Sequence, residues 1–577
     1  MKSSVINYNN FTFAQIRPLE TPSYILKSPW KHLFISISLL VMFFLATSYV
    51  SEENATLDLR EEFYSFQMHN GLSSALGINS CSLFTEESSL NASHLIYKMY
   101  QKVGFKPIWT INHRLNSSAI EVIDLINKAE YYGLDKRFYH AEEINRLYNH
   151  ILNTRNSDSL LMLRQDMELL LTDASLYFMI HLHSGIIPMD SLFNDNFTSA
   201  LTDYLYKSIS HQNASVKILA LQPKNLQYRN LQKALEKFLK SNTLDDEIFE
   251  IPDPDNDPVM SYNMAGTVLT RLGYLTASDR ANDSSIVNAI KEFQRYHGLA
   301  TDGVLNKNTR KAMSMSTRER FMKIALNLDR LRKDIEYPGK RVFVNIPSYQ
   351  LRVIEADQVK RIFNVVVGRP YTPTPEISSK IEKITTAPRW NVPKSITMNE
   401  MLPKVKKDST YLTRNNFKVV DKQLNEVNIN AIGWKEMNRD NFDYYFVQNS
   451  GNSNALGLLK FSFNNPYRIY LHDTPSKRYF KNDIRAYSHG CVRLQDPDQF
   501  ASYLVENNMG TEKKPDISNL LARRIHKEII LSEPLDIHIR YFTCEADENQ
   551  NLYFYKDIYN RDEASIEALF DWKSHLN

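Results

Sequence analysis

The stretch RAYSHGCVRLQDP, residues 485–497, places a cysteine among residue types that support covalent catalysis. Cys491 is one of only three cysteines in the chain, and His489 lies close before it. A second histidine, His472, lies upstream in the strand-like run RIYLHDT. A thiol needs a nearby base to react as a thiolate at neutral pH, and an adjacent imidazole lowers the thiol pKa below its usual value of about 8.5. The pattern therefore predicts that Cys491 is a nucleophile, with His472 or His489 as its base.

The elements around these residues must hold them on one side of a scaffold. Tyr470 and His472 alternate along an extended run, so their side chains share one face of a strand. Gly490 permits a tight turn, because glycine adopts backbone angles that other residues avoid. Such a turn would present the backbone N–H groups of Gly490 and Cys491 beside the sulfur, as an oxyanion hole requires. We therefore expect a strand that carries the base, followed by a loop that carries the nucleophile.

Other chemistries are open to the same residues. His472, His489 and Cys491 are all residue types that bind zinc, but no fourth ligand stands at a typical spacing. A buried, inert cysteine is a better description of Cys544, which lies in an apolar, strand-like run. The three cysteines are too few and too irregularly spaced for a disulfide framework. We expect neither a metal nor a cofactor.

The composition is that of a folded globular protein, because 43% of the residues are hydrophobic and 23% are charged. The formal net charge is only +3, and basic residues are interleaved with acidic ones along the chain. Binding of nucleic acid relies on basic residues gathered into a patch or stripe, so we expect no nucleic-acid partner.

One segment near the N-terminus differs from the rest of the chain. LFISISLLVMFFLATSYV, residues 33–50, contains no charged residue, and its length is about the minimum for a helix that spans a bilayer. Two lysines precede it and two glutamates follow it, so the positive-inside rule keeps residues 1–31 in the cytosol. We expect residues 32–50 to be a transmembrane anchor and the rest of the chain to be exported. A cleaved signal peptide is the alternative.

The remainder of the chain divides into helical and strand-rich regions. Apolar residues recur every three or four positions in stretches such as SSAIEVIDLINKAEYYGL, which is typical of amphipathic helices. Alternating and β-branched runs such as KRVFVNIPSYQLRVIE are typical of strands. We predict, in order, a linker at 51–94, a helical scaffold domain at 95–252, a small helical module at 259–316, a helical connector at 317–340, a mostly-β catalytic domain at 341–545 and a C-terminal extension at 546–577.

Residues 398–454 interrupt the mostly-β region. This stretch is longer than a connection between two strands needs. We expect it to form a lid over the cleft that holds Cys491.

The small helical module resembles a known fold, the three-helix peptidoglycan-binding module. We expect Ala289, Phe293 and Tyr296 to share one face of a helix, and Asp302-Gly303 to form the turn before the last helix. The resemblance implies binding to the cell wall and does not locate a binding site. It rests on Leu272, Gly273, Tyr274, Ala289, Phe293, Gln294, Gly298, Leu299, Asp302, Gly303 and Thr309.

The residues around Cys491 resemble a second family. The stretch Ser488-His489-Gly490-Cys491-Val492-Arg493 matches the S-H-G-C-x-R motif of the L,D-transpeptidases, and His472 stands where that family has an upstream histidine. The likeness extends through VVVGRPYTPTPEISSKI, RWNVPKSI, LPKV, NALGLLKFSF and DIYNRD. With the helical region and the small module, the chain resembles the large YcbB-like type. The resemblance implies an α+β multidomain protein with a mostly-β L,D-transpeptidase sandwich domain, a helical scaffold domain and a small three-helix peptidoglycan-binding module.

The resemblance also implies a role for each residue of the site. Cys491 corresponds to the nucleophile and His472 to the general base, while Tyr470 corresponds to a tyrosine that helps to bind the acyl oxyanion. Asp473 departs from the glycine that many smaller members have after the histidine, so the group that orients the imidazole is left open. We interpret His489 and Arg493, which match motif positions, as shaping the loop and the end of the site that binds a substrate carboxylate rather than as transferring protons. Ser488 and Gly490 belong to the same candidate oxyanion and substrate site, where the amides of Gly490 and Cys491 would supply further oxyanion donors.

The activity implied by this resemblance is peptidoglycan L,D-transpeptidation, which forms 3→3 cross-links between tetrapeptide stems through a cysteinyl thioester and is blocked by carbapenems. An L,D-carboxypeptidase and an enzyme that attaches a protein amine to peptidoglycan are alternatives, whereas the intact motif speaks against a non-enzymatic wall-binding protein. The implied partners are stem peptides as donor and acceptor, glycan polymerases, D,D-carboxypeptidases and the bacterial inner membrane. The implied location is that membrane, with the bulk of the chain in the periplasm.

Overall fold

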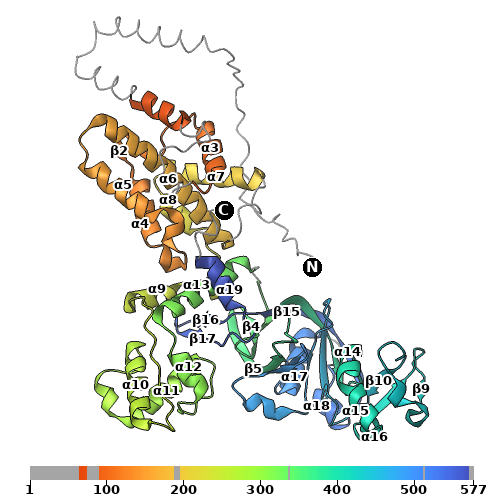
Figure 1. Cartoon of the computed structure of the whole chain (residues 1–577). Helices are drawn as coiled ribbons and strands as arrows, with labels where there is room; N and C mark the ends of the chain where they lie inside the picture. Colours follow the sequence, from red (N-terminus) through yellow and green to blue (C-terminus); the bar gives the residue numbers. More distant parts are fainter. Residues whose placement is uncertain (1–63, 75–89, 187–194, 335–337, 511–513, 571–577) are drawn as a thin grey trace, which may run out of the picture. The chain divides into compact units, whose positions relative to one another are not determined.

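Helices form the N-terminal part of the computed structural model, and a single large sheet dominates the C-terminal part (Figure 1). The predicted segments at 1–31 and 32–50 and most of the predicted linker lie outside the described residues. Among the residues that are described, no helix combines the length and the apolar character needed to cross a membrane. The structure describes residues 64–74, 90–186, 195–334, 338–510 and 514–570.

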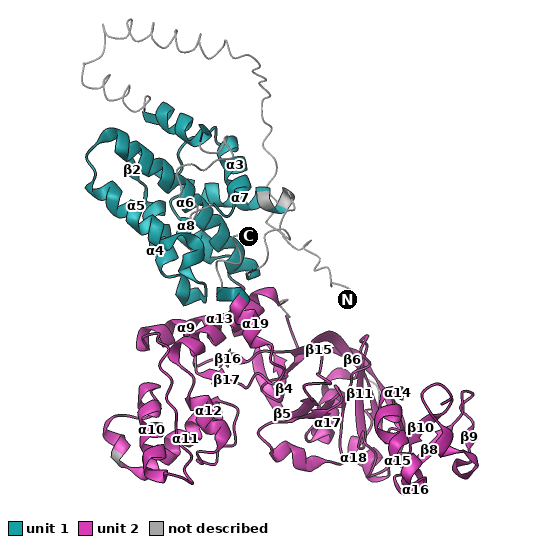
Figure 2. Ribbon diagram, in the orientation of Figure 1, with its two compact units in different colours: residues 1–222, 568–577 teal, residues 223–567 magenta. Residues whose placement is uncertain are grey.

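The chain divides into two units, which Figure 2 shows in different colours. The first unit comprises residues 1–222 and 568–577, and the second comprises residues 223–567. The expected combination of helical regions with a mostly-β domain is confirmed.

The first unit is built around a long helix, α6 (Ser157–Ser184), whose side chains are almost all buried from Met167 to Leu182. Asn156 caps the start of α6 by accepting hydrogen bonds from two backbone N–H groups. Because this part of α6 is buried on all sides, other helices must surround it. These are α3 (Ser93–Lys102), α4 (Ser117–Asn127), α5 (Ala141–Asn153), α7 (Asp195–Ser210) and α8 (Ala214–Leu219), with a short ribbon of β1 (Thr110–Ile111) and β2 (Arg114–Leu115).

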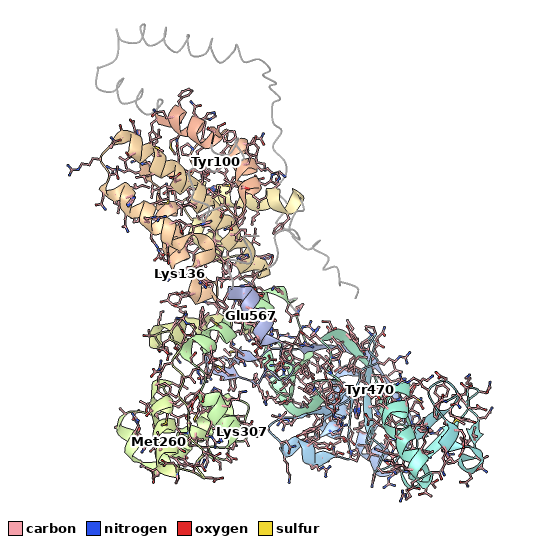
Figure 3. All side chains as sticks on the ribbon, in the orientation of Figure 1. Tyr100, Lys136, Met260, Lys307, Tyr470 and Glu567 are labelled. Atoms are coloured by element: carbon pink, nitrogen blue, oxygen red, sulfur yellow. The ribbon has the colours of Figure 1, made fainter. Side chains whose placement is uncertain are left out.

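Two fully buried carboxylates on α6 form hydrogen bonds that hold residues 92–108 against this helix. Glu168 accepts hydrogen bonds from the Tyr100 hydroxyl at 2.7 Å and from the Ile108 amide at 2.8 Å; Tyr100 is labelled in Figure 3. Asp173 accepts a hydrogen bond from the Ala92 amide at 2.7 Å. Buried carboxylates need such donors to be tolerated, so we assign both a structural role.

The second unit begins with α9 (Leu226–Ser241) and the predicted three-helix module, formed by α10 (Pro258–Arg271), α11 (Asp283–Tyr296) and α12 (Lys307–Met313). Gln294 is fully buried, and its side chain is hydrogen-bonded to Asp302, to Thr309 and to the Gly303 amide. Gly303 has φ +80°, which requires a glycine at this turn. The matching residues of the module therefore serve its packing and its turn.

A capped helix, α13 (Thr317–Lys333), leads from this module into the sheet domain. Ser316 and Glu319 form a capping box at its start. The Lys323 Nζ donates to the carbonyl of Tyr555 at 2.7 Å, and the Asn327 side chain donates to Thr543 at 3.0 Å. These buried contacts join α13 to the C-terminal hairpin of β16 (Cys544–Ala546) and β17 (Leu552–Phe554), which precedes α19 (Asp562–Phe570).

The sheet domain holds nine strands in the order β13-β5-β14-β12-β11-β6-β15-β3-β4, and β4 also pairs with β5, so the sheet closes on itself. Its interior is filled by aliphatic and aromatic side chains, among them the fully buried Phe500 of α17 (Pro497–Asn508), which contacts Phe363 and Phe461. A second helix, α18 (Ile517–Ala522), follows α17. The strands are β3 (Arg341–Asn345), β4 (Gln350–Glu355), β5 (Gln358–Gly368), β6 (Ile377–Thr386), β11 (Leu459–Phe463), β12 (Leu471–His472), β13 (Ala486–Ser488), β14 (Val492–Leu494) and β15 (Lys527–Arg540).

The residues between β6 and β11 fold into a small subdomain, here called the inserted subdomain (residues 390–448). Its four strands follow the order β7-β10-β8-β9, and it has a hydrophobic core of its own that includes Leu412, Trp434 and Phe446. The stretch that we expected to be a lid is thus a folded unit. Its elements are β7 (Trp390–Asn391), α14 (Lys394–Ile396), a π-helical turn η5 (Thr397–Met401), α15 (Leu402–Lys407), α16 (Thr410–Arg414), β8 (Phe417–Val420), β9 (Glu426–Val427) and β10 (Tyr445–Gln448).

Candidate active site

Two neighbouring parallel strands of the closed sheet, β12 and β14, position the candidate catalytic residues. In the β12–β14 pair, Leu471 lies opposite Val492 and His472 lies opposite Arg493. Leu471 and Val492 are fully buried in the core of the sheet. Because successive side chains alternate between the two faces of a strand, His472 and Arg493 lie on the other face.

A third strand adds a cationic side chain to this face. In the β11–β12 pair, Lys460 lies opposite His472, so Lys460, His472 and Arg493 form a row across three strands. The Lys460 Nζ lies 4.2 Å from the centre of the Tyr470 ring, and the rings of Tyr470 and His472 are 5.6 Å apart; Tyr470 is labelled in Figure 3. The structure thus brings the predicted Tyr470, His472 and Arg493 together with Lys460, which sequence reasoning missed.

The orientation of the His472 ring is set by the residue that follows it. The Nδ1 atom of His472 is hydrogen-bonded to the main-chain carbonyl of Asp473. A carbonyl can only accept, so the proton lies on Nδ1 and Nε2 is the unprotonated nitrogen of the neutral ring. The backbone of Leu456 also lies within hydrogen-bonding reach of this ring. The backbone of Asp473 therefore orients the imidazole, which answers the question that the sequence left open.

The Asp473 side chain has a separate, structural role. Its carboxylate accepts hydrogen bonds from the amides of Leu458 at 2.9 Å and Thr474 at 2.7 Å, and it forms an ion pair with Lys477. Gly457 has φ +62°, and a Cβ there would lie 2.2 Å from an oxygen of this carboxylate. Asp473 thus fastens the loop before β11 to the strand that carries His472, and only a glycine fits at position 457.

His472 is held as a neutral imidazole in this environment. Its side chain is buried, and burial lowers its pKa to about 3, with further lowering by the charges of Arg493 and Lys460 and partial compensation by the carbonyl of Asp473. A neutral imidazole can accept a proton, as a general base must. It exerts no charge attraction on a thiolate.

The Cys491 thiol differs from the sequence-based expectation of a lowered pKa. Burial raises its pKa above the ordinary value, although hydrogen bonding from Tyr470 and the charges of Lys460 and Arg493 act in the opposite direction. The physical reason is that His472 is uncharged here and that the half-buried Cys491 side chain is shielded from part of the surrounding water. Among the described residues, no hydrogen bond links Cys491 Sγ to a histidine. The free protein therefore holds a neutral thiol beside a neutral base.

The loop between β13 and β14 carries Cys491 on a glycine turn. Gly490 has φ +112°, and a Cβ there would lie 3.0 Å from the side chain of Ile469. Ser488 is buried; its hydroxyl accepts a hydrogen bond from the Gly490 amide at 3.1 Å and donates to the carbonyl of Cys491 at 2.5 Å. The predicted tight turn is present, and a glycine is needed at its centre.

The Gly490 amide, which we expected to serve as an oxyanion donor, donates to the Ser488 hydroxyl in this structure. The Cys491 amide is different: within the described part of the chain it donates to no acceptor. The Tyr470 hydroxyl lies beside the sulfur, and burial together with the nearby thiol raises its pKa, so it stays protonated and can donate. The available donors at this site are therefore the Cys491 amide and the Tyr470 hydroxyl.

Two residues outside the motif, Thr374 and Tyr559, hold the loop in place through hydrogen bonds. The fully buried Thr374 donates its hydroxyl to the carbonyl of Gly490 at 2.8 Å and accepts from the amide of Gly368 at 2.9 Å. The Tyr559 hydroxyl accepts from the Thr374 amide at 3.0 Å and donates to the Gly368 carbonyl at 2.9 Å. Thr374 and Tyr559 lie in stretches that carried the family resemblance, but nothing in their spacing reveals this role.

The inserted subdomain contacts the same loop and strand. Its Glu400 is hydrogen-bonded to Nε2 of His489, and the Trp390 side chain donates a hydrogen bond to the Tyr470 hydroxyl. Sequence reasoning missed Glu400 and Trp390, because they are far from the motif along the chain and no spacing rule connects them to it. His489 therefore faces a carboxylate of the inserted subdomain.

No group of three His, Cys, Asp or Glu side chains in the described ranges is arranged to hold a metal ion. Cys544 is fully buried and burial strongly raises the pKa of its thiol, which fits the inert role predicted for it.

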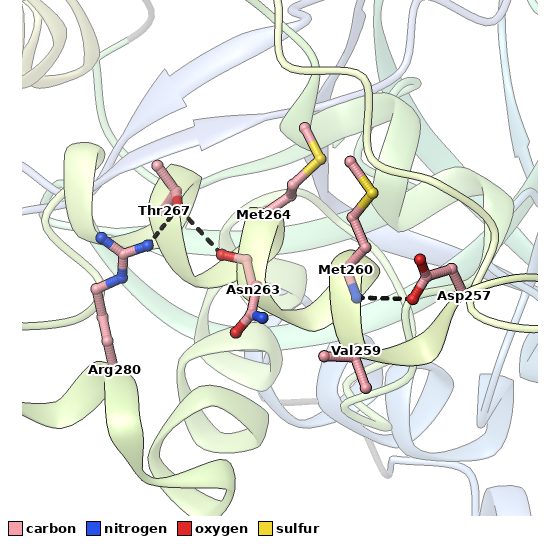
Figure 4. A pocket seen from close by; sticks show the side chains of 7 residues that line it. All are labelled: Asp257, Val259, Met260, Asn263, Met264, Thr267 and Arg280. Atoms are coloured by element: carbon pink, nitrogen blue, oxygen red, sulfur yellow. Dashed lines mark hydrogen bonds between the residues drawn. The ribbon is translucent and has the colours of Figure 1, made fainter.

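A pocket of about 480 Å³ lies on the three-helix module rather than among the residues around Cys491 (Figure 4). Asp257 caps α10 there by accepting from the Met260 amide at 2.9 Å, and Arg280 donates to the Thr267 hydroxyl. The lining residues are Asp257, Val259, Met260, Asn263, Met264, Thr267 and Arg280.

Comparison with known proteins agrees with the resemblance of the motif. The family model for the L,D-transpeptidase catalytic domain matches residues 339–513, that for a scaffold domain matches residues 94–235, and that for a putative peptidoglycan binding domain matches residues 266–313. A putative L,D-transpeptidase of Haemophilus influenzae is 33% identical over 250 residues, which cover 43% of this chain and 50% of that protein. The match thus spans about half the length of this curated relative.

A crystal structure of an L,D-transpeptidase from Stackebrandtia nassauensis aligns with 48% of this chain and 90% of its own, at 16% identity and a TM-score of 0.19. Such a low TM-score adds nothing to the assignment. The domain matches instead extend over the motif around Cys491, the helices of the first unit and the three-helix module. The chain therefore contains the catalytic domain of the L,D-transpeptidase family together with a scaffold domain and a peptidoglycan-binding domain.

Proposed function

We propose that this protein is a peptidoglycan L,D-transpeptidase that forms 3→3 cross-links through a thioester on Cys491. The observation that carries the proposal is the hydrogen bond from His472 Nδ1 to the Asp473 carbonyl, because it leaves Nε2 as a base on the face where the nucleophile lies. The motif and the catalytic-domain match support the same assignment.

The acylation step follows from the groups at the site. The Cys491 thiol transfers its proton to Nε2 of His472 as the sulfur attacks the carbonyl of the third residue of a donor tetrapeptide. The Cys491 amide and the Tyr470 hydroxyl donate hydrogen bonds to the oxyanion that develops. The C–N bond then breaks, the imidazolium returns its proton to the leaving amine of the fourth residue, D-alanine, and a thioester remains on Cys491.

The second step uses the same groups in reverse order. The side-chain amine of the third residue of a neighbouring stem attacks the thioester and gives its proton to His472. The C–S bond breaks, an amide forms between the two stems, and the thiolate takes the proton back. Because the thioester conserves the energy of the cleaved amide, the transfer needs no nucleotide, which suits an extracytoplasmic compartment.

Neutral groups in the free protein fit this sequence of events. A half-buried thiol with a raised pKa is protonated at neutral pH, so it reacts slowly in unselective alkylation and oxidation. The base next to it is uncharged and ready to accept a proton. Proton transfer then coincides with attack on a bound substrate.

The substrates and surroundings are part of the same proposal. Tetrapeptide stems serve as donor and acceptor, and the three-helix module binds the cell wall. An anchor at residues 32–50 holds the protein in the bacterial inner membrane with its bulk in the periplasm. D,D-carboxypeptidases supply tetrapeptide donors, and glycan polymerases supply new strands.

Mass spectrometry of the products tests this function. Full-length protein in detergent is incubated with disaccharide-tetrapeptide, and we expect a dimer whose mass equals two donors minus one D-alanine, with fragments that place the new bond between two third residues. Cys491→Ala should form neither dimer nor acyl-enzyme while it keeps the thermal unfolding midpoint of the wild type within a few degrees.

The possible outcomes separate the candidate activities. A product that has only lost D-alanine would indicate an L,D-carboxypeptidase, and transfer to an added protein amine would indicate attachment of a protein to peptidoglycan. Dimer formation by Cys491→Ala would refute the assignment of the nucleophile.

A further inference from the structure

We propose that Arg369 and Arg493 together form a subsite for one carboxylate of the donor stem, namely the free C-terminal carboxylate of the residue that leaves. This inference rests on the proposed function, since it names the part of the donor that selects it for acylation. Arg493 is the last residue of the motif, whereas Arg369 lies in the loop after β5, in the stretch VVVGRPYTPTPEISSKI that carried the family resemblance but assigned no role to this arginine.

Both arginines are attached to the loop that carries the nucleophile. The Arg369 amide donates to the carbonyl of Ser488 at 3.0 Å, in the same loop as Cys491. Arg493 follows Cys491 by two residues on β14, directly opposite His472. Cys491 lies in the loop directly before β14, and the Arg493 guanidinium is near enough for its charge to lower the pKa of the thiol against the larger effect of burial, which raises it.

Among the residues that the structure describes, neither guanidinium has an acidic partner. Within the described ranges, no carboxylate oxygen lies within 4.0 Å of either group. The Nε atom of Arg493 is buried without a hydrogen-bond partner, and a buried donor in this state calls for an acceptor from elsewhere. The only side-chain bond of Arg369 in the described structure runs from Nη1 to the Tyr371 hydroxyl at 3.0 Å, which is a neutral acceptor.

The two positive charges act on the same small region. Arg369 and burial both lower the pKa of Arg493, and burial is the larger effect. The pKa of Tyr479 is lowered first by its hydrogen bond with Arg478 and also by the charges of Arg493 and Arg369. Tyr479 stacks on Tyr487 with ring centres 4.5 Å apart, which gives this side of the site an aromatic wall. Two like charges without a counterion at a half-buried place are stabilised when an anion binds between them.

The position of Arg369 and Arg493 relative to the sulfur indicates which carboxylate of the donor stem they bind. The bond that breaks joins the third residue to the fourth, so the carboxylate of the fourth residue lies only one residue, about 3.8 Å between Cα atoms, beyond the scissile bond. Cys491 and Arg493 are two positions apart, and an arginine side chain can cover the remaining distance. In a pentapeptide the same group is part of an amide and carries no charge. The pair therefore favours a tetrapeptide donor over a pentapeptide donor.

Donors that differ in a single carboxylate test the assignment. The rate of acyl-enzyme formation is measured by intact mass for the full-length protein with three donors. The first is a disaccharide-tetrapeptide and the second is its C-terminal carboxamide. The third is a donor in which only the side-chain carboxylate of the third residue is amidated. We expect the wild type to acylate the C-terminal carboxamide about 10- to 100-fold more slowly, because hydrogen bonds to a charged group are lost. Amidation of the third residue should have a much smaller effect.

Variants of the two arginines complete the comparison. Arg369→Gln and Arg493→Gln should each lower the ratio of the acylation rate with the free acid to that with the carboxamide, and the double variant should no longer distinguish the two donors. The ratio is the readout because the charge of Arg493 also acts on His472 and Cys491. Arg493→Lys should recover part of the preference, because it keeps the charge and loses the planar fork. Arg361→Gln, on the exposed part of β5, is the matched control and should behave like the wild type.

Each possible result supports or refutes the arginine subsite. Equal rates of the wild type with the free acid and the C-terminal carboxamide would refute the arginine subsite and leave the proposed function intact. A strong effect of amidation on the third residue alone would assign the pair to that carboxylate instead. No acylation by any donor, with Cys491 still open to alkylation, would refute the proposed function and this inference together.

Discussion

Glu400 of the inserted subdomain is hydrogen-bonded to His489, the residue that lies two positions before Cys491. Through this contact a separately folded unit of the chain holds the loop of the candidate nucleophile. A carboxylate only accepts hydrogen bonds, so Nε2 of His489 is the donor. We therefore expect His489 to act as an attachment point of the inserted subdomain rather than as a base.

Loss of the hydrogen bond between Glu400 and His489 should weaken substrate binding more than it slows the chemical step. We expect Glu400→Ala to raise KM for a tetrapeptide donor about 3- to 10-fold with a smaller change in kcat, which corresponds to one partly exposed, charge-assisted hydrogen bond. Steady-state kinetics measures this split, and hydrogen exchange of residues 394–407 should become faster. Glu436→Ala, at an exposed position of the same subdomain, is the control; an equal effect there would show that the pair has no specific role.

The two histidines of the site should differ strongly in their contribution to acylation. His472→Ala removes the proposed base and should slow single-turnover acylation by about 100-fold or more, whereas His489→Ala should cost less than about tenfold. Intact mass measured over time gives both rates. The reverse ranking would transfer the role of the base to His489.

The half-buried thiol of Cys491 should react as a protonated group in the free protein. Because burial raises the pKa of Cys491, the thiolate fraction grows with rising pH through the neutral range and beyond. We expect the rate of its alkylation by iodoacetamide to rise steadily from pH 6 to pH 9, by up to about tenfold per pH unit, with Cys491→Ala as the control for other cysteines. A plateau below pH 7 would instead reveal a thiolate paired with an imidazolium.

The buried hydroxyl of Thr374 should contribute more to stability than its size suggests. Thr374→Val keeps the shape of the side chain but leaves the Gly368 amide and the Gly490 carbonyl without this partner. We expect a loss of about 2 to 4 kcal/mol in the free energy of unfolding, measured by chemical denaturation. Thr413→Val, at an exposed position, should change stability by less than about 0.5 kcal/mol, and equal losses would contradict the assignment.

A carbapenem should modify the site and mark the nucleophile. Inhibition needs a thioester that outlives turnover, so the inhibitor must fit a site shaped for the third residue of a donor stem. We expect intact mass to show one carbapenem adduct, on the peptide that contains Cys491, and no adduct on Cys491→Ala. Acylation by ampicillin at the same rate, or an adduct on Ser488, would argue against both the nucleophile and the family mechanism.

The local pattern of the chain predicts several features that the structure and the comparisons confirm. Apolar spacing identifies helices such as α4 and α11, and alternation identifies strands such as β3 and β4, because these periods are set by neighbouring residues. The S-H-G-C-x-R motif identifies the catalytic domain, because its residues lie within a few positions of one another. The turn at Gly490 follows from the same local reasoning.

Tertiary structure alone decides the state and the support of these residues. The neutral state of His472 and the raised pKa of Cys491 arise from burial between strands that are distant in sequence. The contacts of Glu400 with His489 and of Thr374 with Gly490 join positions that are 89 and 116 residues apart. The sequence by itself thus determined which residue types are available and where helices and strands form. The ring orientation, the charge states and the residues that hold the loop depend on long-range packing and on the removal of water, which no local pattern encodes.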